Sequence, residues 1–507
     1  MPRDIAGVFA RALAADETHE ALVTRRRRWT YAELDDACAR AAGVLLELGV
    51  RPGSRVAASL PNEADIVVAF HGAMRIGAIW VGVNQALAPP EKAYLLDDSG
   101  AALLLCDAAT AASLKPHCAD LPDLRSVVTE DEWGSAWATA PPRLDLLPVD
   151  VHAAAGLAYT SGTTGRPKAA VHSQYNLLTP GAVLTAGRGW DQTLRKGDCL
   201  PLTILNMMVL TTLLVAQAGG TMVAMDQLYA EGVADWIERE RVTVWNGPPP
   251  ILHSLAHDDA IAPEALRTLD EVWSGGAELP EVLRAAFAAK FGLPVIGTYG
   301  LSEAPTVVSI DPPDGTHVAG ASGRVLPHLD VRILDDARRP VAPREVGEIC
   351  LAPMADGPYA GVYRPPVGYW NRPGATAATF ADGLVHTGDV GLLDGNGWLH
   401  IRDRKNLVIV RGGANVYPAE VERVLHAIDG VAGSAVTGVA DDRLGERVEA
   451  AVELDEGAEL TEDDILVRCR GQLARYKVPE RVAIVEALPR NAMGKVDRTA
   501  VAAIVAG

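Results

Sequence analysis

The stretch Leu157-Ala-Tyr-Thr-Ser-Gly-Thr-Thr-Gly-Arg-Pro-Lys168 is the most informative part of the chain. Leu157 to Tyr159 have the pattern of a buried strand, small residues follow, and a helix is expected from about Gln174. Small residues in a row cannot pack a core, but their backbone N–H groups and hydroxyls can surround a polyphosphate. The stretch therefore predicts a phosphate-binding loop, with a flexible surface loop as the alternative.

This loop differs from the Walker pattern of ordinary phosphate-binding loops. Pro167 stands where that pattern needs a glycine, and Ala169 replaces the hydroxyl that binds Mg²⁺. An ordinary P-loop NTPase is therefore disfavoured. The groups expected to surround phosphate are Thr160, Ser161, Gly162, Thr163, Thr164, Gly165 and Lys168, with Arg166 adding charge.

Composition and charge exclude several classes of protein. The 507 residues include 65 acidic and 46 basic side chains, a formal net charge of −19, which is too acidic for a general nucleic-acid or membrane-surface binder. The run from Arg25 to Arg28 is expected to be a solvated turn rather than an anion site. Six cysteines without a C-x-x-C pair indicate reduced, mostly buried thiols. Without a signal-like or membrane-spanning apolar run, we expect a cytoplasmic protein.

Helix-like and strand-like segments alternate on both sides of the loop, which predicts an α/β fold with doubly wound sheets. Thr30 and Glu33 form a capping-box pattern before one of these helices. Short strands separated by Gly, Pro and Asp predict a small β-rich subdomain at about 326–402. Residues 403–507 are expected to form a separate α+β domain, so the large N-terminal domain spans 1–402.

Four further motifs follow the loop in order: Ser274-Gly-Gly-Ala277, Thr298-Tyr-Gly-Leu-Ser-Glu303, His386-Thr-Gly-Asp389 with Asp403-Arg404, and Pro489-Arg-Asn-Ala-Met-Gly-Lys495. Together with the loop they resemble the adenylate-forming superfamily, which includes acyl- and aryl-CoA synthetases, peptide-synthetase adenylation domains and firefly luciferase. The resemblance covers nearly the whole chain and is greatest to acyl- and aryl-CoA synthetases. It implies that a carboxylic acid attacks the α-phosphate of ATP, which gives acyl-AMP and pyrophosphate, and that the acyl group then passes to the thiol of CoA.

The resemblance also implies a role for each motif. The N-terminal domain would bind ATP and the acid. Tyr299 would stack on adenine, and Asp389 would accept hydrogen bonds from the ribose hydroxyls. The implied catalytic residues are Lys168, Ser302 and Lys495, and the implied Mg²⁺ ligands are Glu303 and Thr160. The implied ATP contacts beyond the loop are Gly275, Gly276, Ala277, Tyr299, Gly300, Ser302, Asp389 and Arg404.

By the same resemblance, the C-terminal domain is mobile. It would deliver Lys495 for adenylation and then rotate, so that CoA enters through a tunnel past Gly412 and Gly413. The hinge position is Asn406, where the family generally has Asp or Lys. Asparagine tolerates unusual backbone angles, so rotation is expected to remain possible.

The segment Pro201-Leu-Thr-Ile-Leu-Asn-Met-Met208 lacks a histidine that relatives commonly carry. An apolar, adaptable acid pocket is inferred from Ile204, Leu205, Met207, Met208 and Asn246. The alternative, that these side chains are simply core, stays open. An amino-acid substrate is disfavoured because Val242-Thr-Val-Trp-Asn-Gly-Pro-Pro-Pro250 contains no acidic partner for an amine.

The leading hypothesis is an ATP- and Mg²⁺-dependent acyl-CoA synthetase for a hydrophobic or cyclic carboxylic acid. A stand-alone enzyme that loads an acyl carrier protein is the nearest alternative, and a nucleotide-binding regulatory protein without turnover is the alternative from another class. The joint presence of Lys168, Glu303, Asp389, Arg404 and Lys495 argues against the regulatory protein, because binding alone does not require Lys495. No nucleic-acid or membrane partner is expected.

Overall fold

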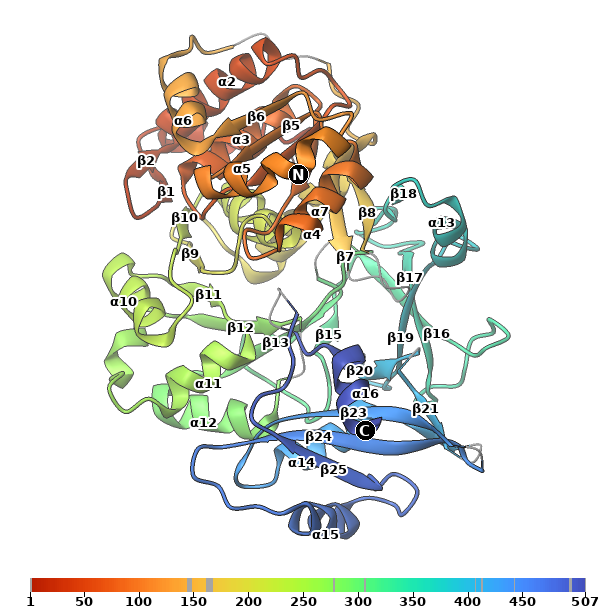
Figure 1. Ribbon diagram of the computed structural model, residues 1–507. Helices are drawn as coiled ribbons and strands as arrows, with labels where there is room; N and C mark the ends of the chain where they lie inside the picture. Colours follow the sequence, from red (N-terminus) through yellow and green to blue (C-terminus); the bar gives the residue numbers. More distant parts are fainter. Residues whose placement is uncertain are drawn as a thin grey trace.

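The computed structural model describes residues 2–143, 148–160, 167–276, 279–304, 307–405, 407–411, 414–441, 443–491 and 495–506. Figure 1 shows two helix-covered sheets in the first part of the chain, a smaller β-rich region after them, and a C-terminal unit beside that region. The α/β fold class predicted from the sequence is confirmed.

The first sheet has seven strands within the described residues, and it contains the strand that leads into the predicted phosphate loop. Its strands run in parallel from β7 to β6, while β8 and β18 are antiparallel additions at one side. In spatial order they are β18 (Gly368–Tyr369), β8 (Lys168–Ser173), β7 (Ala154–Thr160), β4 (Ile79–Gly82), β3 (Arg55–Ser59), β5 (Leu103–Cys106) and β6 (Ser126–Thr129).

The second sheet has nine strands in the described residues, and its central strands are also parallel. In spatial order they are β15 (Arg324–Val325), β14 (Ser309–Ile310), β13 (Val295–Tyr299), β12 (Glu271–Gly275), β11 (Val244–Asn246), β9 (Arg195–Asp198), β10 (Thr221–Ala224), β1 (Glu20–Val23) and β2 (Arg28–Thr30).

Helices separate and cover these two sheets. The largest apolar cluster lies between the sheets and draws on α2 (Tyr31–Glu47), α3 (Ala64–Arg75), α7 (Gln174–Arg188) and α9 (Leu214–Ala218). The outer faces are covered by α4 (Pro89–Ser99) and α5 (Ala108–Leu114) on the first sheet, and by α10 (Ala230–Glu240), α11 (Pro249–His257) and α12 (Glu281–Phe291) on the second. Both faces of each sheet are therefore buried, as parallel sheets require. The remaining helical segments are α1 (Ala10–Asp16), η1 (Lys115–Asp120), α6 (Glu130–Thr139), α8 (Leu205–Met208), η2 (Val209–Leu213) and η3 (Pro263–Leu266).

The predicted β-rich subdomain is present as a four-stranded antiparallel sheet. Its strands, in spatial order, are β16 (Leu329–Leu334), β17 (Gly347–Pro353), β19 (Val385–Leu393) and β20 (Leu399–Arg404), and α13 (Pro373–Thr379) lies between β18 and β19 in the chain. The predicted domain boundary after residue 402 stays a prediction, because β20 continues to Arg404.

The C-terminal region forms the expected α+β unit. Its sheet contains β21 (Ile409–Arg411), β22 (Ala414–Val416), β23 (Val431–Asp441), β24 (Gly445–Leu454) and β25 (Arg481–Val485). Its helices are α14 (Pro418–His426), α15 (Glu462–Gln472) and α16 (Arg498–Ala506). Apolar side chains of α14, α15 and these strands form a core of their own. The α+β character expected for this region is confirmed.

Local signals in the sequence are visible at the helix ends. The Thr30 hydroxyl accepts a hydrogen bond from the Glu33 amide at 3.2 Å, and the Glu33 carboxylate accepts one from the Thr30 amide at 2.9 Å. This capping box starts α2 where the sequence predicts it. All six cysteines are free and five are buried, with Cys118 exposed, as expected. None of the described helices combines the length and apolar character that a membrane crossing requires.

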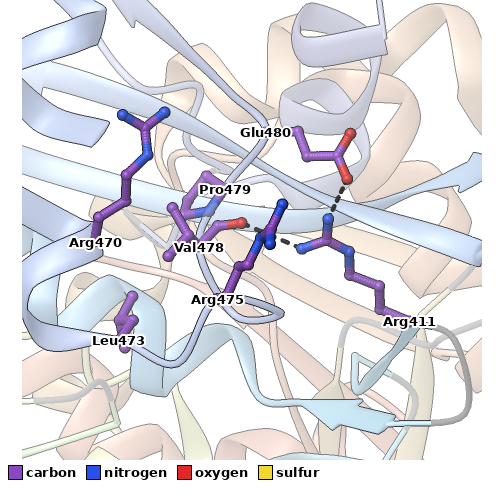
Figure 2. Close-up of a pocket in the computed structure, with 7 residues that line it drawn as sticks. All are labelled: Arg411, Arg470, Leu473, Arg475, Val478, Pro479 and Glu480. Atoms are coloured by element: carbon purple, nitrogen blue, oxygen red, sulfur yellow. Dashed lines mark hydrogen bonds and ion pairs between the residues drawn. The ribbon is translucent and has the colours of Figure 1, made fainter. Parts of the chain in front are cut away.

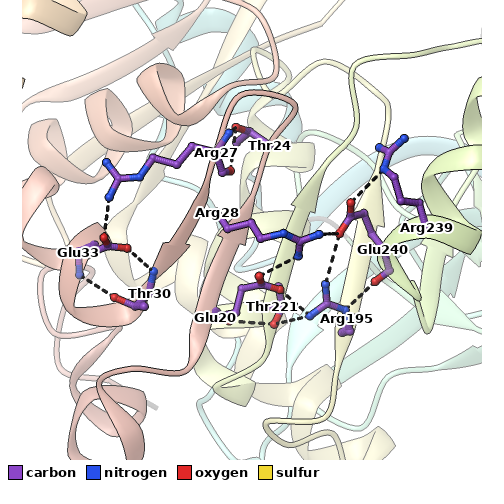
Figure 3. Close-up of polar contacts among 10 residues, drawn as sticks. All are labelled: Glu20, Thr24, Arg27, Arg28, Thr30, Glu33, Arg195, Thr221, Arg239 and Glu240. Atoms are coloured by element: carbon purple, nitrogen blue, oxygen red, sulfur yellow. Dashed lines mark hydrogen bonds and ion pairs between the residues drawn. The ribbon is translucent and has the colours of Figure 1, made fainter.

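The arginine run at the β1–β2 turn is exposed, as predicted, but it is also ion-paired. Arg28 contacts Glu20 at 2.9 Å and Glu240 at 2.5 Å, and Arg27 contacts Glu33 at 2.6 Å (Figure 3). Arg25 pairs with Asp226 at the end of β10. These carboxylates offset the positive charge of the arginines. The ion pairs connect the β1–β2 hairpin to α2, to the end of β10 and to α10.

A buried ion pair lies inside the second sheet. Lys196 and Asp198 on β9 are both fully buried, and the Thr211 hydroxyl donates to the same carboxylate at 2.8 Å. Burial raises the pKa of Asp198, and Lys196 and the Thr211 hydrogen bond oppose that rise. Removing either charge would leave the other in an apolar core, which is a large cost.

We predict that Lys196→Met destabilises the N-terminal domain by about 3–5 kcal/mol, because Asp198 then loses its buried partner. The buried lone carboxylate must take up a proton, so the loss should grow as the pH rises from about 5 to about 8. Urea denaturation at both pH values measures it. Arg339→Met, which breaks an exposed pair with Asp335, is the control and should cost at most about 1 kcal/mol. Equal losses in the two variants would contradict the prediction.

Candidate active site

The predicted phosphate loop joins two antiparallel strands. Thr160 at the end of β7 pairs with Lys168 at the start of β8, and the Thr160 hydroxyl donates to the Lys168 carbonyl at 3.3 Å. The expected helix starts at Gln174, immediately after β8. The loop residues Ser161, Gly162, Thr163, Thr164, Gly165 and Arg166 lie outside the described residues, so their phosphate contacts stay predictions. The pairing of β7 with β8 therefore fixes the positions of the two residues, Thr160 and Lys168, that bound the loop.

Lys168 lies in a partly buried group with Tyr369 and Glu303. Its Nζ atom is 3.8 Å from the centroid of the Tyr369 ring, and the Tyr369 hydroxyl donates to the Glu303 carboxylate at 2.6 Å. Burial lowers the pKa of Lys168; Glu303 opposes this shift and Arg404 adds to it. Tyr369 therefore orients the two side chains expected to meet phosphate and Mg²⁺.

A buried histidine connects the phosphate hairpin to the motif of Ser302 and Glu303. His172 on β8 is 2% exposed, and its Nε2 atom is 2.7 Å from the Ser302 carbonyl. Because a carbonyl oxygen only accepts, Nε2 carries the proton. Burial lowers the pKa of His172, which favours the neutral ring. This bond ties the hairpin to the Ser302–Glu303 backbone, although the two segments are far apart in the chain.

Glycines lie where β12 and β13 end at the same sheet edge. Gly275 pairs with Thr298, and a Cβ added to Gly275 would lie 2.1 Å from the Thr298 hydroxyl oxygen. Gly276 has a φ of +80°, and a Cβ added there would meet no atom of the described residues within 4 Å. Both positions therefore need glycine. An open backbone at this edge suits a ligand that approaches closely, as predicted for adenine; Ala277 lies outside the described residues.

Tyr299, Asp389 and Arg404 form a second group. The Tyr299 hydroxyl donates to Asp389 at 2.6 Å, and Arg404 Nε is 3.1 Å from the other carboxylate oxygen. Asp389 and Arg404 are opposite each other on β19 and β20. Burial raises the pKa of Asp389, while Arg404 and the Tyr299 hydrogen bond oppose the rise. The stacking of Tyr299 on adenine stays a prediction; its ring is buried and its hydroxyl already binds Asp389.

Lys495 of the C-terminal domain faces this second group. Figure 1 shows the chain before α16 extending from the C-terminal sheet toward the N-terminal domain. The pKa of Lys495 is lowered by loss of hydration and then by the positive charge of Arg404, while Asp389 opposes the shift. The Lys495 amide donates to the Asn491 side chain at 3.1 Å. The structure thus brings Lys495 to the site that the N-terminal motifs form.

The junction between the domains is held by Asp403. Its carboxylate accepts hydrogen bonds from the Ala419 amide at 2.9 Å and from the Arg404 amide at 2.7 Å. The Ala419 bond links the last strand of the β-rich sheet to the first turn of α14. The predicted hinge residue Asn406 and the predicted tunnel residues Gly412 and Gly413 lie outside the described residues, so their roles stay predictions.

The predicted acid-pocket residues are mostly packed in the core. Leu205, Met207 and Met208 are 4%, 5% and 0% exposed and belong to the cluster between the sheets, and Ile204 packs against it. Asn246, at the end of β11, lies with its side-chain nitrogen 3.8 Å from the Met207 sulfur. The π-helix η2 follows them, a feature that is frequent at functional sites. The segment 201–208 thus follows strand β9 and contacts the end of β11 through Asn246. Its role as an acid pocket stays a prediction.

A groove of about 550 Å³ lies elsewhere, on the C-terminal domain (Figure 2). Its lining includes Arg411, Arg470 and Arg475. Arg411 forms an ion pair with Glu480 and donates a hydrogen bond to the Tyr476 carbonyl at 2.8 Å. Among the described residues, none that the sequence singled out lines it. The groups that the sequence predicts to be catalytic are thus not among the residues that line this groove.

Sequence reasoning missed His172 and Tyr369. Both residues lie on neighbouring strands that are far apart in the sequence. His172 is on β8, and Tyr369 is on β18, which pairs with β8 so that Tyr369 lies opposite Ala170. Tyr369 follows Gly368 in a stretch that showed only short-strand features. A polar residue inside the apolar run of β8 was the one available signal for His172.

Two family models match most of the chain. A model described as "AMP-binding enzyme" matches residues 9–355, and one described as "AMP-binding enzyme C-terminal domain" matches residues 420–495. The chain is 35% identical to the long-chain-fatty-acid–CoA ligase FadD13 of Mycobacterium tuberculosis, over 93% of this chain and 92% of that protein. It is also 35% identical to a feruloyl-CoA synthase of an Amycolatopsis species, over 92% of both chains.

Solved structures agree with this assignment. The ATP-bound structure of MatB from Rhodopseudomonas palustris matches with a TM-score of 0.90 at 29% identity over 98% of both chains. The apo structure of MatB has a TM-score of 0.79 at the same identity and coverage, so the arrangement seen here is closer to the ATP-bound form. The five sequence motifs predicted membership of this family. The chain belongs to the family of AMP-binding enzymes, and the expectation of an AMP-forming acid–CoA ligase is confirmed at that general level.

Proposed function

We propose that this protein is an acyl-CoA synthetase that activates a hydrophobic or cyclic carboxylic acid as acyl-AMP and transfers the acyl group to CoA. The observation that carries the proposal is the convergence of Lys168, Glu303, Asp389, Arg404 and Lys495. Each of these side chains acts electrostatically on at least one of the others, although they come from separate motifs. A purely nucleotide-binding protein would not need Lys495 at the same place.

The chemistry requires positive charge where negative charge gathers. A carboxylate must approach the triphosphate, so cations at the α-phosphate stabilise the transition state most. Lys168 and Lys495 are the ammonium groups available, and their lowered pKa values reflect loss of hydration. In this proposal both bind phosphate oxygens of ATP.

The residues present suit Mg²⁺ as well. Glu303 is a partly buried carboxylate, the hard oxygen ligand that Mg²⁺ prefers, and Tyr369 orients it. Glu303, with Thr160 as a second oxygen, would hold the ion, which neutralises phosphate charge when bound. Asp389 is left to accept from a ribose, with Arg404 fixing its orientation.

The acid substrate class follows from the segment after β9. Ile204, Leu205, Met207 and Met208 carry no charge, and Met207 contacts Asn246, which is polar but neutral. A pocket that opens here would suit an apolar acid and disfavour an amine or a second carboxylate. Relatives named for feruloyl, indoleacetate and fused-ring propanoyl substrates support a ring-bearing or aliphatic acid.

Acid-dependent ATP–pyrophosphate exchange, without any thiol, tests the proposal. We expect exchange with one class among medium-chain, aryl and polycyclic acids, because an uncharged pocket can bury the apolar part of such an acid away from water. Amino acids and dicarboxylic acids are the controls. Exchange with a control alone would overturn the substrate class, and no exchange despite ATP binding would favour the regulatory alternative. CoA and a pantetheinylated carrier protein are then compared as acceptors.

We predict that Lys495→Ala slows the adenylation half-reaction by about 10²–10³-fold, the scale for losing one transition-state donor. Thioester formation from preformed acyl-AMP should survive, because the α-phosphate is by then no longer attacked. Rapid-quench measurement of each half-reaction separates the two. The exposed Lys115→Ala variant is the control and should retain both rates. Equal loss in the two half-reactions would contradict the assignment.

Tyr369→Phe keeps the ring over Lys168 but removes the hydroxyl that donates to Glu303. We expect the Mg²⁺ concentration for half-maximal exchange to rise by about 10-fold, since groups that orient a metal ligand commonly contribute that much. A Mg²⁺ titration of the exchange rate measures the change. Tyr363→Phe is the matched control, because Tyr363 is another buried tyrosine outside the Glu303 group. An unchanged Mg²⁺ requirement in Tyr369→Phe would rule out the orienting role.

A further inference from the structure

Three side chains with metal-binding atoms meet on the β-rich sheet, apart from the Glu303 group. Glu348 and Cys350 are two residues apart on β17 and so share one face of the strand. His386 on β19 is the register partner of Cys350. Within the described residues, these three form a group whose ligand atoms all lie within 4.8 Å of one another.

The distances in this group suit a tetrahedral ion. The Cys350 sulfur is 3.4 Å from His386 Nδ1, and that nitrogen is 3.6 Å from a Glu348 oxygen. Zinc bonds of about 2.3 Å to sulfur and about 2.0–2.2 Å to nitrogen or oxygen place tetrahedral ligands about 3.3–3.6 Å apart. The two separations from His386 Nδ1 therefore match those of neighbouring ligands around one ion, and the sulfur and the carboxylate oxygen lie within 4.8 Å of each other.

Hydrogen bonding alone leaves the group poorly satisfied. His386 Nδ1 faces both the thiol and the carboxylate, and it can either accept from Cys350 or donate to Glu348, but not both. The ring is 9% exposed, and among the described residues its Nε2 atom has no partner. A cation between the three groups would use the thiolate, the imidazole and the carboxylate together.

The surrounding charges permit such an ion. Lys405 lies 3.6 Å from Glu348 but only 2.9 Å from Asp336, so it has another partner when Glu348 binds a cation. A thiolate and a carboxylate together balance a divalent charge. The Glu348 side chain is 15% exposed, which leaves an edge of the group open to solvent.

From this geometry we propose that Glu348, Cys350 and His386 form a binding site for a divalent cation of the zinc class. The set of one sulfur, one nitrogen and one oxygen ligand favours such an ion over Mg²⁺, which prefers oxygen alone. Three protein ligands leave the fourth position to water, an open site in the sense of zinc enzymes.

The site would act on the ATP motif next to it. The Gly388 amide donates to the other Glu348 oxygen at 3.3 Å, and the Asp389 amide donates to the Thr387 hydroxyl at 3.0 Å. Thr387 in turn donates to the Ile349 carbonyl at 2.7 Å, between Glu348 and Cys350. A cation bound to one Glu348 oxygen withdraws negative charge from the other, and therefore weakens the hydrogen bond from Gly388 that helps to hold the backbone next to Asp389. This consequence rests on the proposed function, and we expect zinc to weaken ATP binding at least several-fold.

Co²⁺ titration of the full-length protein tests the site itself, because cobalt bound to a thiolate gives a charge-transfer band in the near ultraviolet. We expect that band in the unmodified protein, with zinc displacing it, and at least about 10-fold weaker binding in Cys350→Ser and Glu348→Gln. Cys469→Ser, a buried cysteine of the C-terminal core, and Cys118→Ser, the exposed cysteine, are the controls and should keep the band. Circular dichroism checks that each variant is folded.

The outcomes separate the site from its effect. No band in the unmodified protein, or an undiminished band in folded Cys350→Ser and Glu348→Gln, would overturn the metal site whatever the enzyme's substrate is. Calorimetric ATP binding with and without zinc tests the coupling. Weaker binding in the unmodified protein but not in Cys350→Ser supports it, and equal binding in both overturns it while the cobalt result still stands.

Discussion

The rest of the site depends on one buried carboxylate, Asp389, and on the groups that hold it. Tyr299 contacts it from the second sheet and Arg404 from the neighbouring strand, and the charge of Lys495 in the C-terminal domain acts on it electrostatically. A carboxylate at 5% exposure is stable as an anion only with such partners. Holding Asp389 charged therefore requires that three separate parts of the chain come together, and the predicted nucleotide site lies at the same place.

The phosphate side of the site follows a similar logic, in which one polar bond joins two distant segments. His172 ties β8 to the Ser302 carbonyl, and Tyr369 ties Glu303 to the ring beneath Lys168. Each bond satisfies a buried polar group and at the same time fixes a residue that is predicted to contact ATP or Mg²⁺. Preorganisation of this kind avoids reorganisation during the reaction, which is where much of catalytic power arises.

Much of this could be predicted from the sequence, because the signals were local. The Thr30–Glu33 capping box, the alternating helices and strands and the five motifs each depend on short spacings. The failures were of another kind. The arginine run at Arg25 to Arg28 is exposed as expected, yet its acidic partners Glu240 and Asp226 lie about two hundred positions away in the chain. The neighbours of His172 and Tyr369 were equally invisible in the local sequence.

The sequence by itself determined the family and which residues are predicted to carry the chemistry, since hydroxyls, glycines and lysines at those spacings suit little besides a bound nucleotide. Tertiary structure alone decided which of them touch: that Tyr369 orients Glu303, that Asp389 is shared by Tyr299 and Arg404, and that Cys350 faces His386. The physical reason is that strand register and domain packing set these distances. Both depend on the whole buried core, which no single motif contains.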